Sequence, residues 1–222
     1  MSEYVIMPSN DYQNVCDTIR EASGKTDLIK SGDLSSEIAE LTKKIGKASF
    51  KSSVMPSETV WTSVTYGDGK FVAVSQYSTT AAYSTDGINW TDCTMPSESR
   101  WYNVAYGNGK FVAVSYLING STAAAYSTDG INWTAFSLPY GYSESVTYGN
   151  GKFVAMVNGN IALYSTDGIN WSNSKMPRSE DWTSVTYGDG KFVAVSQYSI
   201  TAAYSTDGIN WTVSTMPNKE HW

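Results

Sequence analysis

The chain has 222 residues and a formal net charge of −6, with a sequence pI near 4.7, which argues against binding to nucleic acid or to an anionic membrane surface. Its two cysteines, Cys16 and Cys93, indicate neither a disulfide framework nor a cysteine-based metal site, and we expect no metal and no cofactor. No apolar run reaches the roughly 18 residues of a membrane-spanning helix, and residues 1–10 lack the features of a secretory signal, so we expect no signal peptide and no membrane insertion.

We predict two short helices within residues 10–46, because apolar residues recur there at intervals of three and four after capping-type residues and glycine breaks. These positions are Tyr12, Val15, Cys16 and Ile19 in the first helix, and Leu34, Ile38, Leu41 and Ile45 in the second. Two such helices cannot readily form a core of their own. We therefore expect residues 1–47 to be an attachment or assembly segment that docks on the rest of the chain, on a copy of itself or on a partner.

A seven-residue segment, Ser-Thr-Asp-Gly-Ile-Asn-Trp, occurs four times without change, at residues 84–90, 127–133, 165–171 and 205–211. Its tryptophans are 43, 38 and 40 residues apart at Trp90, Trp133, Trp171 and Trp211. A period near 40 residues with β-type signals throughout is typical of four-stranded propeller blades. We predict an all-β propeller over residues 48–222, with repeats at 55–94, 95–137, 138–175 and 176–215.

We predict four strands in each repeat, here called a to d. A tight hairpin joins strand a to strand b in every repeat, since both turn residues must tolerate positive φ. The hairpin pairs are Asp68-Gly69, Asn108-Gly109, Asn150-Gly151 and Asp189-Gly190. Strand b is apolar on both faces, with Phe71 and Ala73 on one side and Val72 and Val74 on the other, as expected for a sheet that lies between neighbouring sheets.

The two ends of the array leave its closure open. Ala48-Ser49-Phe50 matches the start of a strand d, and residues 216–222 match the start of another strand a. This gives one strand too many for a ring closed by four blades. Either the ring closes at four with a surplus strand, or a larger ring is completed by another chain or by further residues; some closure is required because open sheet edges aggregate.

The repeated segment, preceded by a tyrosine in every repeat, resembles the Asp-box (BNR) repeat found in sialidases and many other propellers. It is a shortened variant, because Gly87 directly follows Asp86 and Asn89 stands where threonine is common. The resemblance implies a structural turn between the outer two strands. The residues suit that role: Asp86 can accept hydrogen bonds from amides of its own turn, Gly87 can adopt positive φ and Trp90 can bury its ring.

We expect no enzyme. The sialidases use three arginines on the substrate carboxylate, whereas this chain has only Arg20, Arg100 and Arg178, from the helical segment and two different repeats. Its single histidine, His221, makes histidine-based triads improbable. Four glutamates near the predicted d-to-a segments are expected to be solvated loop charges, although a glycosidase pair stays open. They are Glu58, Glu98, Glu144 and Glu180.

Ligand binding is predicted where the repeats differ. The hairpins and the Asp-containing turns hardly vary, whereas the b-to-c and d-to-a segments, expected on the opposite face, change in length and content. They carry aromatic rings beside amides, which suit the stacking and hydrogen bonding of sugars, while the alternative for the tryptophans is packing in the core. The candidates are Gln76, Tyr77, Tyr116, Asn119, Asn158, Asn160, Gln197 and Tyr198 in the b-to-c segments, and Trp61, Trp101, Tyr140, Tyr142 and Trp182 in the d-to-a segments.

Residues 11–34 resemble the N-terminal segment of tail and minor structural proteins of phages and prophages of Gram-positive bacteria. It includes Asp11-Tyr12-Gln13, Gly24-Lys25-Thr26-Asp27 and Ser31-Gly32-Asp33-Leu34. The resemblance implies a virion location and contacts with other tail proteins through residues 1–47. We therefore expect a non-enzymatic phage adhesin that binds a bacterial surface glycan, with a structural tail component as the alternative, a glycoside hydrolase as a weaker one, and a homo-oligomer as a possibility.

Overall fold

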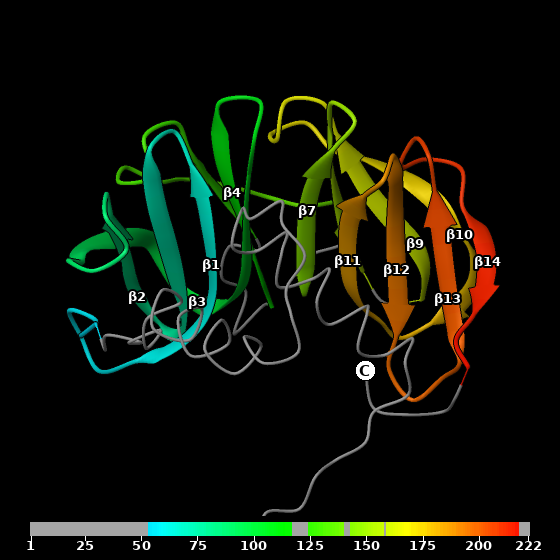
Figure 1. The fold of residues 1–222 in the computed structure, drawn as a ribbon, viewed down its shortest axis with the longest axis horizontal. Helices are drawn as coiled ribbons and strands as arrows, with labels where there is room; N and C mark the ends of the chain where they lie inside the picture. The colour runs from blue at the N-terminus through cyan, green and yellow to red at the C-terminus, as the bar shows by residue number, and fades with distance from the viewer. Residues whose placement is uncertain (1–52, 117–123, 140–142, 158, 218–222) are drawn as a thin grey trace, which may run out of the picture. The chain divides into compact units, whose positions relative to one another are not determined.

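The structure is a computed structural model, and the chain divides into two units, Met1–Ser52 and Ser53–Trp222. It describes residues 53–116, 124–139, 143–157 and 159–217 of the second unit (Figure 1). The predicted helices within residues 10–46 and the strand predicted at residues 48–50 lie outside this part. The described part is all β, as predicted, and contains no helix that is long and apolar enough to cross a membrane.

In the described residues, fourteen strands form one six-stranded and two four-stranded antiparallel sheets. The first sheet, in the order β1 to β6, contains β1 (Val60–Gly67), β2 (Lys70–Ser84), β3 (Thr91–Gly107), β4 (Lys110–Tyr116), β5 (Ala124–Ser127) and β6 (Thr134–Phe136). The second contains β7 (Ser145–Gly149), β8 (Lys152–Met156), β9 (Gly159–Ser165) and β10 (Ser172–Glu180), and the third contains β11 (Trp182–Gly188), β12 (Lys191–Ser196), β13 (Thr201–Ser205) and β14 (Thr212–Thr215).

The last two sheets have the predicted order a, b, c, d, but the first two repeats share one sheet. There β2 spans the predicted strands b and c of repeat 1, and β3 spans strand d of repeat 1 together with strand a of repeat 2. They are continuous because Gln76 pairs with Arg100 and Ser78 with Ser99 across the predicted loops, with irregular register between these pairs. Backbone pairing therefore joins the b-to-c segment of repeat 1 to the d-to-a segment that follows it, although the local sequence predicts a loop at both places.

The four predicted hairpins are confirmed. The first turn residue has positive φ in each, 45° at Asp68, 46° at Asn108, 44° at Asn150 and 46° at Asp189, and a glycine with φ of 71° to 74° follows. These are the conformations that a two-residue hairpin needs to match the twist of its strands. In Figure 1, β1, β7 and β11 run in the same direction, each toward such a turn.

Three hydrophobic cores lie between successive repeats. In the first, Val72 and Val74 of repeat 1 pack with Trp101 and Val104 of repeat 2, and all four side chains are buried. The second core joins repeats 2 and 3, and the third joins repeats 3 and 4 through equivalent positions. Each repeat thus uses one side of its sheet toward the preceding repeat and the other side toward the following repeat.

Candidate functional site

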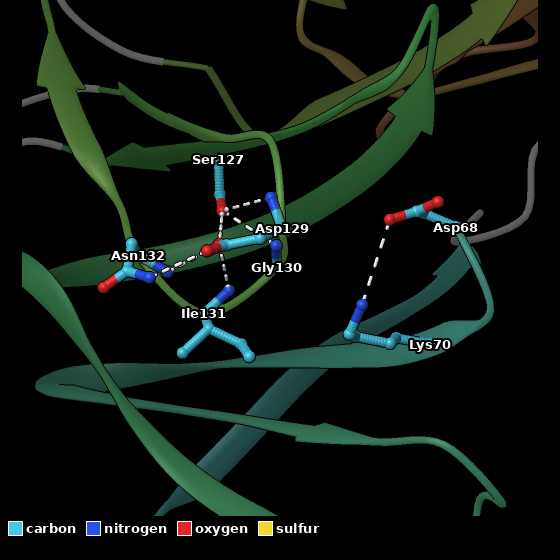
Figure 2. Close-up of polar contacts among 7 residues, drawn as sticks. All are labelled: Asp68, Lys70, Ser127, Asp129, Gly130, Ile131 and Asn132. Atoms are coloured by element: carbon cyan, nitrogen blue, oxygen red, sulfur yellow. Dashed lines mark hydrogen bonds and ion pairs between the residues drawn. The ribbon is translucent and has the colours of Figure 1, made fainter.

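The four Asp-containing turns have the same pattern of hydrogen bonds, and Figure 2 shows the second of them. In the second turn, Asp129 Oδ1 accepts bonds from the amides of Ile131 (2.9 Å) and Asn132 (2.8 Å), and its Oδ2 accepts a bond from Asn132 Nδ2 (2.7 Å). The hydroxyl of Ser127 donates to Asp129 Oδ1 and accepts a bond from the amide of Gly130 (2.8 Å). The carboxylate is therefore used inside its own turn, as expected for a structural role.

These contacts stabilise the charged form of the aspartates. The hydrogen bond from the Asn132 amide, followed by the effects of the Asn132 side chain, the Ile131 amide and Ser127, holds the pKa of Asp129 well below its usual range despite some burial. Bonds from Asn89 and Ile88 likewise lower the pKa of Asp86. For Asp167 and Asp207, burial alone would raise the pKa, but the equivalent hydrogen bonds outweigh it and the pKa is again lowered.

The hairpins lie beside these turns. Asn108 Nδ2 donates to the carbonyl of Thr166 (3.1 Å), and Asn150 Nδ2 donates to the carbonyl of Thr206 (3.0 Å), in each case from one repeat to the turn of the next. In repeat 1 the hairpin has Asp68, which forms an ion pair with Lys70 (3.8 Å; Figure 2). The hairpins of repeats 2 and 3 therefore help to join each of these repeats to the next one.

The b-to-c segments of repeats 1 and 4 each present a tyrosine with positive φ, Tyr77 at an irregularity in the pairing of β2 and Tyr198 in a turn. Tyr77 has a φ of 56° and is 52% exposed, and Tyr198 has a φ of 58° and is 67% exposed. Positive φ is an outlier for a bulky residue and is maintained only where the surrounding structure fixes it. The backbone at both positions is therefore fixed by its surroundings, and both tyrosine side chains are exposed.

Serine side chains fix the backbone around both tyrosines. The buried hydroxyl of Ser75 donates to the carbonyl of Thr80 (2.6 Å), and Ser78 Oγ accepts a bond from the amide of Thr80 (2.9 Å). In repeat 4, Ser196 Oγ donates to the carbonyl of Thr201 (2.8 Å), and Ser199 Oγ accepts a bond from the Thr201 amide (3.0 Å). Two parts of the chain that are far apart in sequence thus build the same rigid support for a tyrosine.

An arginine lies over the first of these tyrosines. The guanidinium carbon of Arg100 is 4.6 Å from the centroid of the Tyr77 ring, and the backbones of Gln76 and Arg100 pair in the sheet. A b-to-c segment and a d-to-a segment therefore meet, as expected from their predicted placement on one face. The contact joins an exposed aromatic ring to a cation with five N–H donors, which suits an anionic or carbonyl-rich ligand.

The tryptophan candidates are placed differently from one another. Trp101 and Trp182 are completely buried and pack in the cores between repeats, so they offer no ring face to a ligand. Trp61 is half-buried. Among the other candidates, Asn160 is exposed and Gln76 and Gln197 are half-buried, whereas Asn119, Tyr140, Tyr142, Asn158 and the side chain of Tyr116 lie outside the described residues.

Two of the four glutamates, Glu144 and Glu180, differ from solvated loop charges. Glu58 and Glu98 are exposed, and Glu180 accepts a bond from the hydroxyl of Thr201 (2.9 Å). Glu144 is half-buried, and this burial, together with the negative charge of Asp181, raises its pKa above the usual value. Within the described ranges no group of three histidine, cysteine, aspartate or glutamate residues could hold a metal ion.

Comparison with known proteins identifies the fold. No family model and no curated protein sequence matches the chain. Among solved structures, it is similar to virginiamycin B lyase from Staphylococcus aureus, with a TM-score of 0.61 and 16% identity over 73% of this chain and 57% of the lyase. It is also similar to YCF48 from Cyanidioschyzon merolae, with a TM-score of 0.59 and 16% identity over 77% of this chain and 61% of YCF48. A chain of the nidogen/laminin complex matches with a TM-score of 0.58 and 10% identity, over 73% of this chain and 66% of that chain. These structures are β-propellers, and the described part of the chain has a propeller fold.

The comparisons correct the functional prediction. The prediction of a non-enzymatic phage adhesin for a bacterial glycan was wrong: the matched propellers include virginiamycin B and streptogramin B lyases, which are enzymes, and those named here include no phage protein or adhesin. The same matches to lyases contradict the prediction that the chain is not an enzyme. The chain spans 57% of the lyase and 61% of YCF48. The virion location and the contacts of residues 1–47 with tail proteins stay predictions.

Proposed function

We propose that the chain is a propeller module that binds a peptide or protein segment at the surface formed by its b-to-c and d-to-a segments. The stacked pair of Tyr77 and Arg100 carries this proposal. Tyrosine and arginine are enriched at the energetic centres of protein interfaces, because each supplies a large contact area together with directed polar groups. Among the similar propellers, YCF48 is known bound to a D1 peptide, and another chain belongs to the nidogen/laminin complex.

The rigidity of the site supports this proposal. A side chain that is held outward before binding loses little conformational entropy when a partner arrives, so a fixed tyrosine contributes more to affinity than a mobile one. The hydroxyls of Ser75 and Ser78 fix the backbone around Tyr77. We also propose that each repeat forms one blade and that the four Asp-containing turns are of the Asp-box type.

A peptide array of random and natural sequences, probed with the full chain, tests the proposed function. We expect binding that falls at least tenfold in Tyr77→Ala and in Arg100→Gln, because each change removes one half of the stacked pair. Lys191→Gln is the matched control, because it removes an exposed cation beside an a-to-b hairpin, away from the b-to-c and d-to-a segments. No binding to any peptide, equal binding by all variants, or selective binding to a glycan array instead would contradict the proposal.

A second candidate function is a lyase-type reaction with Glu144 as the group that transfers a proton. The half-burial of Glu144 and its raised pKa favour this candidate, because carboxyl groups with raised pKa values are common at catalytic sites. Quinupristin, which is present in one structure of the similar lyase, is the first compound to test. Cleavage followed by mass spectrometry is expected to be lost in Glu144→Gln and retained in Glu98→Gln; no cleavage by the unchanged chain contradicts the candidate.

A further inference from the structure

Two nearly identical segments of the chain differ in burial. Residues 61–91 and 182–212 differ only at Thr79 and Ile200. Yet Val64 is 58% exposed whereas its equivalent Val185 is 6% exposed, and Val72 is fully buried whereas its equivalent Val193 is 39% exposed. Since the local sequence is the same, the difference comes from the neighbouring repeat, which covers opposite sides of the two segments.

The uncovered side of repeat 1 is here called the head face. It contains Met55, Trp61, Val64, Tyr66 and Ala73, the equivalents of Met95, Trp101, Val104, Tyr106 and Ala113 in the first core. Tyr66 is 59% exposed, and a hollow of about 370 Å³ is lined by Met55, Trp61, Thr62, Ser63, Val64, Ala73 and Trp90. In the first core, the corresponding space is filled by Val72, Val74 and Ala81 of the preceding repeat.

The uncovered side of repeat 4 is here called the tail face, and it contains Gly188, Val193, Val195, Ala202 and Tyr204. Val193 and Tyr204 are 39% and 38% exposed. These residues are the equivalents of Gly67, Val72, Val74, Ala81 and Tyr83, which in repeat 1 pack against repeat 2. The tail face therefore carries the side chains that would fill the hollow of a head face.

One close contact recurs at all three junctions between repeats. A Cβ added to Gly67, Gly107 or Gly149 would lie 2.0 Å from Cγ of Tyr106, Tyr148 or Tyr187 in the following repeat. A Cβ added to Gly188 would meet no atom of the described residues within 4 Å. The tail face thus has the glycine of this contact without its tyrosine, and the head face has the tyrosine Tyr66 without its glycine.

Hydrogen bonds between successive repeats also recur at the junctions inside the chain, and one of them lacks its acceptor at the tail face. Thr62 Oγ1 donates to the carbonyl of Trp101 in the following repeat (2.5 Å), whereas the buried Oγ1 of its equivalent Thr183 has no hydrogen-bond partner among the described residues. Ser63 Oγ likewise accepts a bond from the amide of Val104 (3.2 Å), and Ser145 Oγ one from the amide of Val185 (3.0 Å). A buried hydroxyl without a partner is costly, so Thr183 marks a surface that is built for a neighbour.

From these observations we infer that the tail face of one copy of this chain binds the head face of a second copy. Every residue of this contact has a counterpart at a junction inside the chain. The tail face of repeat 4 matches the side of repeat 1 that repeat 2 covers. The head face of repeat 1 matches the side of repeat 4 that repeat 3 covers. Tyr66 would lie on the partner's Gly188, and Thr183 would donate to the partner's Trp61 carbonyl. Two copies joined at both ends form the smallest closed assembly, which leaves neither face exposed.

The molar mass in solution tests this inference. For the full chain, we expect light scattering to give twice 24.3 kDa at micromolar concentration. The variants Gly188→Leu on the tail face and Val64→Arg on the head face should each have the mass of one copy. Both should keep the unfolding temperature of the dilute wild type, because the first has open space around it and the second is exposed. The matched control Ile200→Thr introduces the residue found at the equivalent Thr79 and should stay associated.

Mixing the two variants distinguishes head-to-tail contact from other arrangements. Gly188→Leu retains an intact head face and Val64→Arg an intact tail face, so an equimolar mixture should form a complex of two copies through one junction. Failure of the mixture to associate, or association of either variant alone, would overturn the inference. A wild-type chain with the mass of one copy at high micromolar concentration would overturn it as well, because the faces would then be covered within one chain or stay exposed.

Discussion

The ring of Tyr106 lies so close to Gly67 that a Cβ on the glycine would be 2.0 Å from Cγ of the tyrosine. The same contact joins Gly107 to Tyr148 and Gly149 to Tyr187. Neighbouring repeats are therefore joined at positions where only glycine fits, and the tyrosine of one repeat occupies the space that a side chain of the preceding repeat would need.

The first prediction concerns this contact. Gly107→Ala should lower the free energy of unfolding by about 1–3 kcal/mol, because the added methyl group overlaps the ring of Tyr148 and the core must shift to accept it. Urea unfolding followed by tryptophan fluorescence measures the change. Gly188→Ala introduces the same methyl group with nothing within 4 Å and serves as the control, at a dilution where the chains are single. Equal destabilisation by both changes would show that the loss comes from the backbone and not from the ring.

A second prediction follows from the Asp-containing turns. Their four aspartates have a lower pKa in the folded chain than in the unfolded chain, so the unfolded chain binds more protons at acidic pH. The stabilisation is fully present above about pH 5 and is lost as the pH falls below 3.8, the usual value for aspartate. Unfolding temperatures from pH 7 to pH 2 should show this loss, and Asp129→Asn should make it shallower. An unchanged slope in the variant would contradict the role given to the carboxylate.

A third prediction concerns the strained tyrosines. Tyr198→Asn should raise the free energy of unfolding by up to about 1 kcal/mol, because asparagine tolerates a φ of 58° better than tyrosine does. Differential scanning calorimetry measures this change. A lower stability in the variant would mean that the contacts of the Tyr198 ring outweigh the strain of its backbone.

A fourth prediction concerns the thiol of Cys93. Burial raises its pKa to about 11, with Asp92 and Asp129 adding to the rise and Trp133 opposing it. Relative to a cysteine with the usual pKa of 9.0, its reactive thiolate should be about 100-fold rarer at pH 7.5. The alkylation rate of a Cys16→Ser variant, compared between the folded and the urea-unfolded chain, measures this difference. Similar rates in both states would contradict the burial of the thiol.

Several local features could be predicted from sequence because they depend on a few adjacent residues. The hairpins at Asp68, Asn108, Asn150 and Asp189 have the positive φ that their residue types favour. The hydrogen bonds to Asp129 were expected for the same reason, since a short turn brings the carboxylate to its own amides. The continuous strands β2 and β3 could not be predicted, because they arise from pairing between repeats.

Burial at the ends of the array could not be read from local sequence either. Trp61 and Trp182 begin the same 31-residue segment apart from one substitution, yet Trp182 is fully buried and Trp61 is half-buried. For the same reason, the sequence could not show which of the candidate ligand residues are exposed and which are buried. Trp101 and Trp182 are core residues and Tyr77 is exposed, and the distinction depends on which neighbour packs against each ring.

The equivalence of the junctions also affects how this chain can change over evolutionary time. If residues 138–175 were removed, Val112 and Val114 of repeat 2 would meet Trp182 and Val185 of repeat 4, the same side-chain types that already pack together elsewhere in the array. Gly107 would then meet Tyr187, so the glycine–tyrosine contact would also be kept. Gain or loss of whole repeats by recombination therefore needs no new core.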